Sequence, residues 1–294
     1  MSVFSQQDKN TIKLLRIPFS LLLMPVFLLA ISQTTELNYQ NAIWSFLIIH
    51  LLVYPASNGY NSYIDRDETS IGGLERPPMP TKQLFYLTIF MDSLAIILAF
   101  QFVNILFAIA ILLYILASRA YSSKQIRLKK YPFLGFFIVV IFQGGFTYFM
   151  SSSGISNIQL DFSLENMLIL FACSLQIAGA YPLTQVYQHK EDLRDGVVTL
   201  SYKLGYKGTF IFTGIMFAIC NLFYFLFFQS KNSISHFYIL QLFFFPIVIY
   251  FGYWFIKVLK NNEEANFKNS MRMNLIAAVC MNSCFVLFIY LKFS

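Results

Sequence analysis

Long apolar stretches recur along the whole chain and are separated by shorter polar segments. They fall near residues 17–35, 41–60, 83–118, 132–150, 165–185, 208–229, 236–256 and 273–291. Apart from 83–118, each is close to the ~20 residues that a helix needs to cross about 30 Å of hydrocarbon. Residues 83–118 are long enough for two helices, with a polar break at Gln101–Asn104. We therefore expect residues 1–294 to form one membrane-embedded, all-α domain with nine transmembrane helices.

The composition agrees with a membrane protein. Hydrophobic residues make up 57% of the chain and charged residues only 12%, whereas a soluble domain carries about 25% charged residues. Only Lys231 and Lys292, of 21 Lys and Arg residues, fall on one side of the predicted layout. Because basic residues concentrate in cytoplasmic loops, we expect the N-terminus and the loops 60–82, 119–131 and 186–207 to be cytoplasmic.

This topology explains the net charge of +7 without nucleic acid, and we expect no nucleic-acid partner. The expected surroundings are a lipid bilayer, specifically a bacterial inner membrane. The long, charged loops on the cytoplasmic side are candidates for function, since functional residues concentrate in loops held by a rigid scaffold.

Two of these loops carry polar residues at helical spacing. Asn61, Asp65 and Thr69 are spaced i, i+4, i+8, and Gln188, Asp192 and Asp195 are spaced i, i+4, i+7. Residues at these spacings share one face of a helix. Two such faces at the membrane surface suit Mg²⁺, which binds a few protein oxygens together with substrate phosphates and water. The predicted metal ligands are Asn61, Asp65, Gln188, Asp192 and Asp195.

Basic residues near these loops suit the remaining charge of a diphosphate. Arg127, Lys129 and Lys130 lie in the loop 119–131, and Arg16 precedes the first apolar stretch. Arg and Lys both bind phosphate, Arg through two parallel hydrogen bonds and Lys as a point charge. The competing interpretation is that both loops are ordinary solvated segments whose acids offset the basic charge. Matched spacing in both loops favours the diphosphate site.

The motifs resemble those of the UbiA superfamily of intramembrane prenyltransferases. The family pattern Asn-Asp-x-x-Asp-x-x-x-Asp with a later Arg-Pro is similar to Asn61–Thr69 with Arg76-Pro77. The pattern Asp-x-x-x-Asp-x-x-x-Gly-x-x-Thr-Leu, followed by Leu-Gly, is similar to Gln188–Leu200 with Leu204-Gly205. The basic segment after helix four and the Arg-x-Pro before helix one are also similar. Three positions depart from the family pattern, because an aspartate of that pattern is replaced at Ser62, Thr69 and Gln188. The nearby acids that could compensate for these substitutions are Asp67, Glu68, Glu191 and Asp195.

The resemblance implies a fold, an activity and roles for residues. It implies a nine-helix UbiA-like bundle that transfers an isoprenyl group from an isoprenyl diphosphate, through an allylic cation, to a hydrophobic or aromatic acceptor, with Mg²⁺ as cofactor. Quinone biosynthesis is the commonest setting in the family. The implied catalytic residues are Asp65 and Asp192, and the implied diphosphate ligands are Arg16, Asn61, Arg127 and Lys129. Candidate walls of an apolar tunnel, or alternatively packing and lipid-facing residues, are Phe136, Phe137, Phe142, Phe146 and Tyr148.

The sequence is also compatible with two other functions, and it leaves two alternative roles for Asp92. The missing carboxylates allow a non-catalytic relative that binds an isoprenoid or a partner. A nine-span protein can also be a transporter, although its polar residues would then concentrate within the membrane. Asp92 lies inside an apolar stretch, where an acid either has a function or pairs with a polar group on another helix.

Overall fold

The computed structural model describes residues 5–156 and 162–294. The first half contains α1 (Gln6–Leu14), α2 (Ile17–Ser20), η1 (Leu21–Leu23), α3 (Pro25–Gln33), α4 (Tyr39–Leu47), η2 (Ile48–Val53), α5 (Tyr54–Asp65), α6 (Lys82–Phe102) and α7 (Ile105–Ser122). It continues with η3 (Leu128–Lys130), α8 (Pro132–Val140), η4 (Ile141–Gly145), α9 (Phe146–Ile155), α10 (Leu164–Leu183), α11 (His189–Arg194), α12 (Leu200–Ser230), α13 (Ile234–Lys260), η5 (Asn262–Glu264) and α14 (Phe267–Phe293). Within the described residues the fold is all-α, with one isolated β-bridge between Ile71 and Leu74.

Eight helical segments of the described chain are long and apolar enough to cross a membrane. The bent pair Gln6–Ser20 and Pro25–Gln33 makes nine when it is counted as one span, which agrees with the predicted number. The chain is therefore a multi-pass integral membrane protein. The eight segments are Tyr39–Asp65, Lys82–Phe102, Ile105–Ser122, Pro132–Ile155, Leu164–Leu183, Leu200–Ser230, Ile234–Lys260 and Phe267–Phe293.

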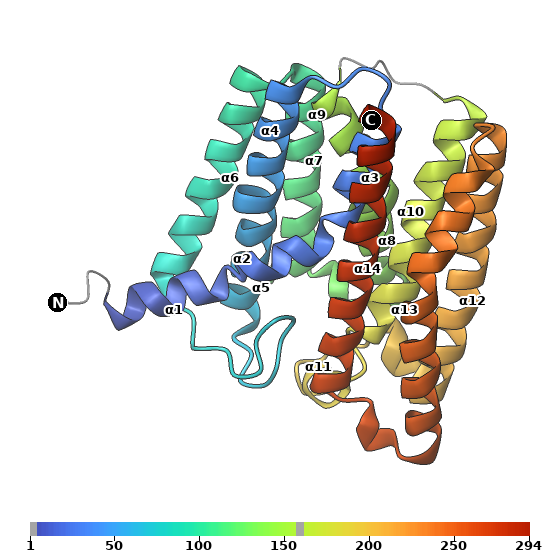
Figure 1. The fold of residues 1–294 in the computed structure, drawn as a ribbon. Helices are drawn as coiled ribbons and strands as arrows, with labels where there is room; N and C mark the ends of the chain where they lie inside the picture. The colour runs from blue at the N-terminus through green and yellow to red at the C-terminus, as the bar shows by residue number, and fades with distance from the viewer. Residues whose placement is uncertain (1–4, 157–161) are drawn as a thin grey trace.

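The first span differs from the continuous helix expected over residues 17–35. The chain bends by 40° between its two helical parts, and Arg16 adopts a left-handed conformation with φ of 51° between α1 and α2. A separate helix, α3, begins at Pro25, because proline is well tolerated at the first position of a helix, where its missing N–H costs nothing. As a result α1 lies across the end of the bundle while α3 runs along it (Figure 1). The break places Arg16 beside the motif loops.

Consecutive spans alternate in direction, so both motif loops lie at the same end of the bundle. Figure 1 shows the connection from α5 to α6 and the short helix α11 together at the lower end, opposite the C-terminus. The connection from α7 to α8 is at that end too, because α6 and α7 run in opposite directions. The structure thus brings together the three loops that the sequence singled out.

A π-helical turn interrupts the span Pro132–Ile155. Gly144, within η4, has non-helical angles of φ −98° and ψ −107°. A Cβ added to Gly144 would lie 2.5 Å from Ser174 Cα on α10, closer than atoms can pack. Gly145 N donates a hydrogen bond to Ser174 Oγ at 3.0 Å, replacing part of the helical pattern. Glycine at both positions therefore allows η4 and α10 to pack backbone against backbone.

Asp92 is paired across two spans. The Nε of Arg119 on α7 donates to Asp92 Oδ2 on α6 at 2.8 Å. The Arg119 guanidinium also lies 3.9 Å from the centre of the Tyr60 ring and donates to the Thr88 carbonyl at 3.2 Å. This arrangement confirms pairing with a polar group on another helix. It stabilises the contact between α5, α6 and α7.

Candidate functional site

A cavity of about 340 Å³ lies between the helices at the motif-loop end. We call it the first cavity. Its polar end is formed by both motif loops and its apolar end by side chains of η1, α7, η4 and α14. The titratable or amide side chains at the polar end are Arg16, Asn58, Asn61, Asp65, Asp67, Lys129, Gln185, Tyr187, Gln188, Asp192 and Asp195.

The first motif loop leaves its helix earlier than the i, i+4, i+8 pattern requires. Helix α5 ends at Asp65, and Arg66 adopts the left-handed conformation with φ of 57°. Thr69 therefore does not share a helical face with Asp65, and that expectation is wrong. Thr69 instead donates a hydrogen bond from its hydroxyl to Glu191 of the other loop. The same reversal of the chain brings Asp67 into the first cavity.

The second motif loop keeps its predicted spacing. Gln188 precedes α11, Asp192 lies on it and Asp195 follows it, and all three line the first cavity. The loop is closed by two backbone hydrogen bonds, from Asp192 N to Gln188 O at 2.9 Å and from Val197 N to Asp192 O at 2.7 Å. Gly196 allows this turn with a φ of 69°. Three of the predicted metal ligands are thus brought together here.

Gln188 also joins the two loops. Its Nε2 donates to the carbonyl oxygen of Ser70 at 3.2 Å. Together with the contact between Thr69 and Glu191, this bond fixes the first loop against the second. Gln188, which stands where the family pattern has an aspartate, therefore uses its amide N–H in a contact that a carboxylate cannot make.

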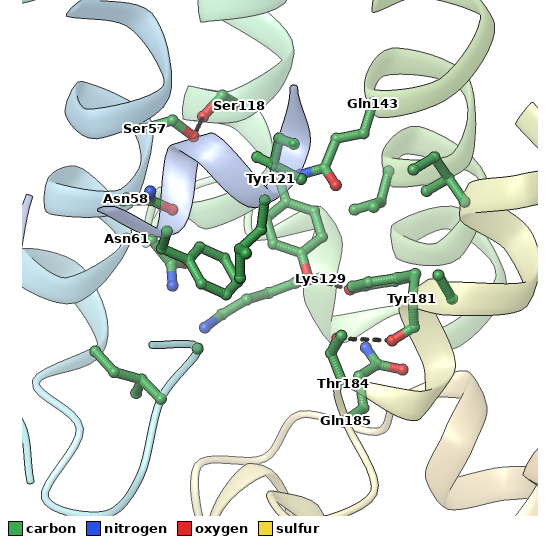
Figure 2. A pocket seen from close by; sticks show the side chains of 18 of the residues that line it. Ser57, Asn58, Asn61, Ser118, Tyr121, Lys129, Gln143, Tyr181, Thr184 and Gln185 are labelled. Carbon is green, nitrogen blue, oxygen red and sulfur yellow. Dashed lines mark hydrogen bonds between the residues drawn. The ribbon is translucent and has the colours of Figure 1, made fainter. Parts of the chain in front are cut away.

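Lys129 reaches across the first cavity toward Asn61 (Figure 2). Its ammonium forms an ion pair with Asp65 Oδ2, and only 11% and 4% of the two side chains are exposed. Arg127, two residues earlier, has a φ of 47° and is not among the residues that line the cavity. Of the two predicted diphosphate ligands in this loop, the structure therefore places Lys129 in the site and leaves Arg127 outside it.

Arg16 lies at the edge of the first cavity and braces the first loop. Its two terminal nitrogens donate to the carbonyl oxygens of Gly72 at 3.1 Å and Asn58 at 3.0 Å. Its Nε is buried without a hydrogen-bond partner. The guanidinium thus contributes positive charge to the site while two of its donors are engaged by backbone.

Hydroxyl groups set the orientation of other side chains in the cavity. Ser122 Oγ donates to Asn61 Oδ1 at 2.8 Å, which fixes the amide at the C-terminal end of α5. The hydroxyls of Tyr121 and Tyr181 are hydrogen-bonded to each other (Figure 2). Both tyrosines line the first cavity.

Asp65, Asp67 and Asp192 lie close enough to affect one another's ionisation and are partly shielded from water. Burial, with the nearby Asp65 carboxylate adding to the effect, raises the pKa of Asp67 to about 6. Burial likewise raises the pKa of Asp192 to about 7, with Asp67 and Asp65 adding to the effect and Lys129 opposing it. Asp65 Oδ1 is buried and accepts no hydrogen bond. Such a site has an excess of negative charge that a cation would neutralise.

The donor set fits Mg²⁺ that is shared between protein and ligand. No group of three His, Cys, Asp or Glu side chains in residues 5–156 and 162–294 is close enough to hold a metal ion by itself. Mg²⁺ is usually bound by one or two carboxylates, water and substrate phosphates rather than by a complete protein cage. Asp65, with its unpartnered oxygen, and Asp67 and Asp192, with their raised pKa values, meet that requirement.

Some lining residues could not have been selected from their spacing. Asp67 follows Asp65 by two residues and would face away from it on a continuous helix, so its place in the cavity depends on the turn at Arg66. Tyr121 on α7 pairs with Tyr181 on α10, a contact between helices far apart in the chain that local spacing does not reveal. Asn58, Gln185 and Tyr187 had no distinguishing pattern.

The aromatic wall is only partly as expected. Phe142 lines the first cavity. Phe137 is 54% exposed on the outside of the bundle, and Phe136 packs against Phe212 on α12. Phe146 and Tyr148 line a second cavity. The alternative of lipid-facing and packing residues therefore holds for Phe136 and Phe137.

Comparison with known proteins places this fold and its motifs in one family. A sequence model described as the UbiA prenyltransferase family matches residues 21–276. The structure is similar to a UbiA homologue from Archaeoglobus fulgidus bound to GPP and Mg²⁺, with a TM-score of 0.70, 16% identity and coverage of 96% of this chain and 99% of that one.

Two further solved structures have the same fold. An apo UbiA homologue from Aeropyrum pernix K1 matches with a TM-score of 0.66, 16% identity and coverage of 97% and 99%. A digeranylgeranylglyceryl phosphate synthase matches with a TM-score of 0.61, 18% identity and coverage of 97% and 98%. No curated protein sequence matches the chain. The family model covers most of the sequence, and the chain belongs to the UbiA prenyltransferase family.

Proposed function

We propose that this protein transfers an isoprenyl group from an isoprenyl diphosphate to a hydrophobic acceptor that carries an aromatic ring. The observation that carries the proposal is the composition of the first cavity. Three acids from two separate loops, Asp65, Asp67 and Asp192, meet Lys129 at one end, and an apolar chamber begins directly beyond them. A charged head group and an apolar chain need these two environments side by side.

In the proposed reaction, the isoprenyl group becomes joined to the aromatic ring of the acceptor. The C–O bond of the donor breaks, its electron pair leaves with the diphosphate, and the allylic cation is attacked by the electron-rich ring, which then loses a proton. The apolar end of the first cavity, with Tyr114, Phe142 and Met281 among its walls, suits both the isoprenyl chain and the ring. Aromatic faces also stabilise a nearby cation.

The charged end suits the leaving group. Mg²⁺, when bound, supplies positive charge that offsets the charge of the diphosphate. Asp65, Asp67, Asp192 and Asp195, together with the amide oxygens of Asn61 and Gln188, are the groups that would hold it. Lys129 is positioned to move from Asp65 to a phosphate oxygen, because its ammonium already lies inside the cavity. Positive groups placed where negative charge develops lower the barrier to ionisation.

Two contacts favour a second candidate, a protein of this family that binds an isoprenoid without catalysis. Lys129 neutralises Asp65, and Gln188 bonds to the Ser70 backbone, so two positions of the family pattern are engaged in contacts within the protein. A transporter has less support, since the charged groups gather at one end of the bundle. We further propose that this end is cytoplasmic, in a bacterial inner membrane, with quinone biosynthesis as the setting.

The test is release of diphosphate by purified protein supplied with isoprenyl diphosphates and aromatic acceptors, with and without Mg²⁺. We expect Mg²⁺-dependent release in the wild type and a loss of at least about a hundredfold in Asp65→Asn, as for removal of a group that acts on developing charge. Glu165→Gln, at the far end of α10, is the matched control and should not change the rate. Binding without release would support the non-catalytic candidate.

A further inference from the structure

A second cavity, of about 420 Å³, lies farther from the motif loops, between α3, η4, α9 and α10. Its predominantly apolar wall includes Gln33, Phe146, Phe149, Met167, Leu170 and Ser174. The site described above does not use it. Its position relative to the first cavity indicates what it could hold.

The two cavities are neighbours along the same two elements. On α10, Gln176 lines the first cavity and Ser174 the second, and two residues of helix correspond to a rise of about 3 Å. On η4, Phe142 and Gln143 line the first cavity, and Gly145 lines the second. The cavities therefore meet at the π-helical turn, at the end of the first cavity that is remote from the charged loops.

A row of aromatic rings crosses this junction. Tyr114 and Phe142, in the first cavity, have ring centres 6.4 Å apart. Phe142 and Phe146 are 4.7 Å apart, and Phe146 and Phe149, in the second cavity, are 6.0 Å apart. The contact between Phe142 and Phe146 is thus part of the partition between the two cavities. Truncation or rotation of either ring should open a passage between the two cavities.

The partition is built on an irregular backbone. Gly144 has non-helical angles, and Thr147 Oγ1 donates to the Phe142 carbonyl at 2.7 Å, five residues back. π-Helical turns of this kind are frequently found at functional sites. Here the turn sets Phe142 toward one cavity and Phe146 toward the other.

We propose that the second cavity receives the distal part of a long isoprenyl chain whose diphosphate is held in the first, and that Phe142 and Phe146 control its entry. This inference rests on the proposed function, and it assigns the donor to the class of long-chain isoprenyl diphosphates. An apolar chain anchored at the charged loops extends toward Phe142, and burial of each further methylene group stabilises the complex. Short donors stay within the first cavity.

The experiment measures Mg²⁺-dependent binding of non-hydrolysable isoprenyl diphosphate analogues of increasing chain length. In the wild type, affinity should keep rising with length beyond the shortest analogue. Met167→Trp fills the second cavity and should weaken the longest analogue about tenfold, the loss expected when about two methylene groups remain unburied. It should leave the shortest analogue unchanged. Phe237→Trp, a partly buried ring on α13 that lines neither cavity, is the control.

A second measurement locates the chain directly. A long analogue with a photoreactive group at its distal end should label α9 or the first half of α10, and Phe142→Ala should increase that labelling. Label confined to the first cavity or to lipid-facing helices would overturn the proposal, as would a Met167→Trp variant that affects all lengths equally or none. If the wild type binds no analogue of any length, the proposed function fails too; if it binds all lengths equally, only this inference fails.

Discussion

Lys129 on η3 pairs with Asp65 at the last turn of α5, and both side chains are buried. The pair joins the basic loop to the first motif loop inside the first cavity. The Lys129 ammonium pairs with Oδ2 of Asp65, whereas Oδ1 of the same carboxylate has no hydrogen-bond partner. We expect ligand binding to rearrange this ion pair.

Removing the cation alone should destabilise the protein. Lys129→Met leaves Asp65 buried and unpaired, and loss of one partner of a buried ion pair costs about 3–5 kcal/mol. The double variant Lys129→Met with Asp65→Asn should recover most of the stability but not the binding of a diphosphate analogue. Thermal unfolding in detergent and analogue binding measure the two effects. Equal stability of the single variant and the wild type would show that the pair is not formed.

Binding should depend on pH through Asp192. Its pKa is raised to about 7 in the fold from an ordinary value of 3.8, so metal-free stability falls as the pH rises between these values and then levels off. Mg²⁺ needs the ionised form. Since about one-tenth of Asp192 is ionised at pH 6, Mg²⁺-dependent analogue binding should weaken about tenfold between pH 8 and pH 6. Titrations of the wild type at several pH values measure this change.

The control for this pH dependence is Asp192→Asn. Its remaining dependence should shift to lower pH, where Asp67, with a pKa of about 6, titrates. Protonation of the analogue itself affects both proteins alike and cancels in the comparison. Identical pH profiles for the two proteins would contradict the assignment of Asp192 to the metal site.

The close contact between η4 and α10 should not tolerate a methyl group. Gly144→Ala brings its Cβ to 2.5 Å from Ser174 Cα, and overpacking of this kind costs typically about 1–3 kcal/mol. Gly252→Ala on α13, where a Cβ meets nothing within 4 Å, is the matched control and should not lower the unfolding temperature. Equal unfolding temperatures for the two variants would show that the helices do not pack backbone to backbone at this position.

The buried pair of Asp92 and Arg119 should matter for stability alone. Asp92→Asn removes the charge that compensates Arg119, and we expect a lower unfolding temperature with unchanged affinity for a diphosphate analogue. Neither residue lines the first cavity, so the substitution should lower stability without changing the binding of the analogue. A fall in affinity without a fall in stability would assign Asp92 a function instead.

The fold was predictable because membrane spans are set by length and hydropathy. Apolar stretches and the one-sided distribution of Lys and Arg gave the span count and placed both motif loops at one end. The break at Arg16 was not predictable, since its left-handed conformation leaves no mark on hydropathy. The local spacing of Gln188, Asp192 and Asp195 survived because α11 keeps them on one helical turn and its two ends.

The site was predictable only where a helix continued. The turn at Arg66 ends the helix before Thr69, so Asp67 lines the first cavity and Thr69 does not. Arg127 and Lys129 were equal candidates in the sequence, and the η3 turn directs only Lys129 into the first cavity. Positions such as Tyr181 depend on contacts between spans far apart in the chain, which a single sequence does not reveal.

The most direct test of the central claim is binding of a non-hydrolysable isoprenyl diphosphate analogue to purified protein, with Mg²⁺ and with a chelator. The wild type is compared with Asp65→Asn combined with Asp192→Asn, and Glu165→Gln is the control. We predict binding that requires Mg²⁺ and is lost in the double variant but not in the control. Absence of binding by the wild type, or equal binding by the double variant, would contradict a diphosphate site at these loops.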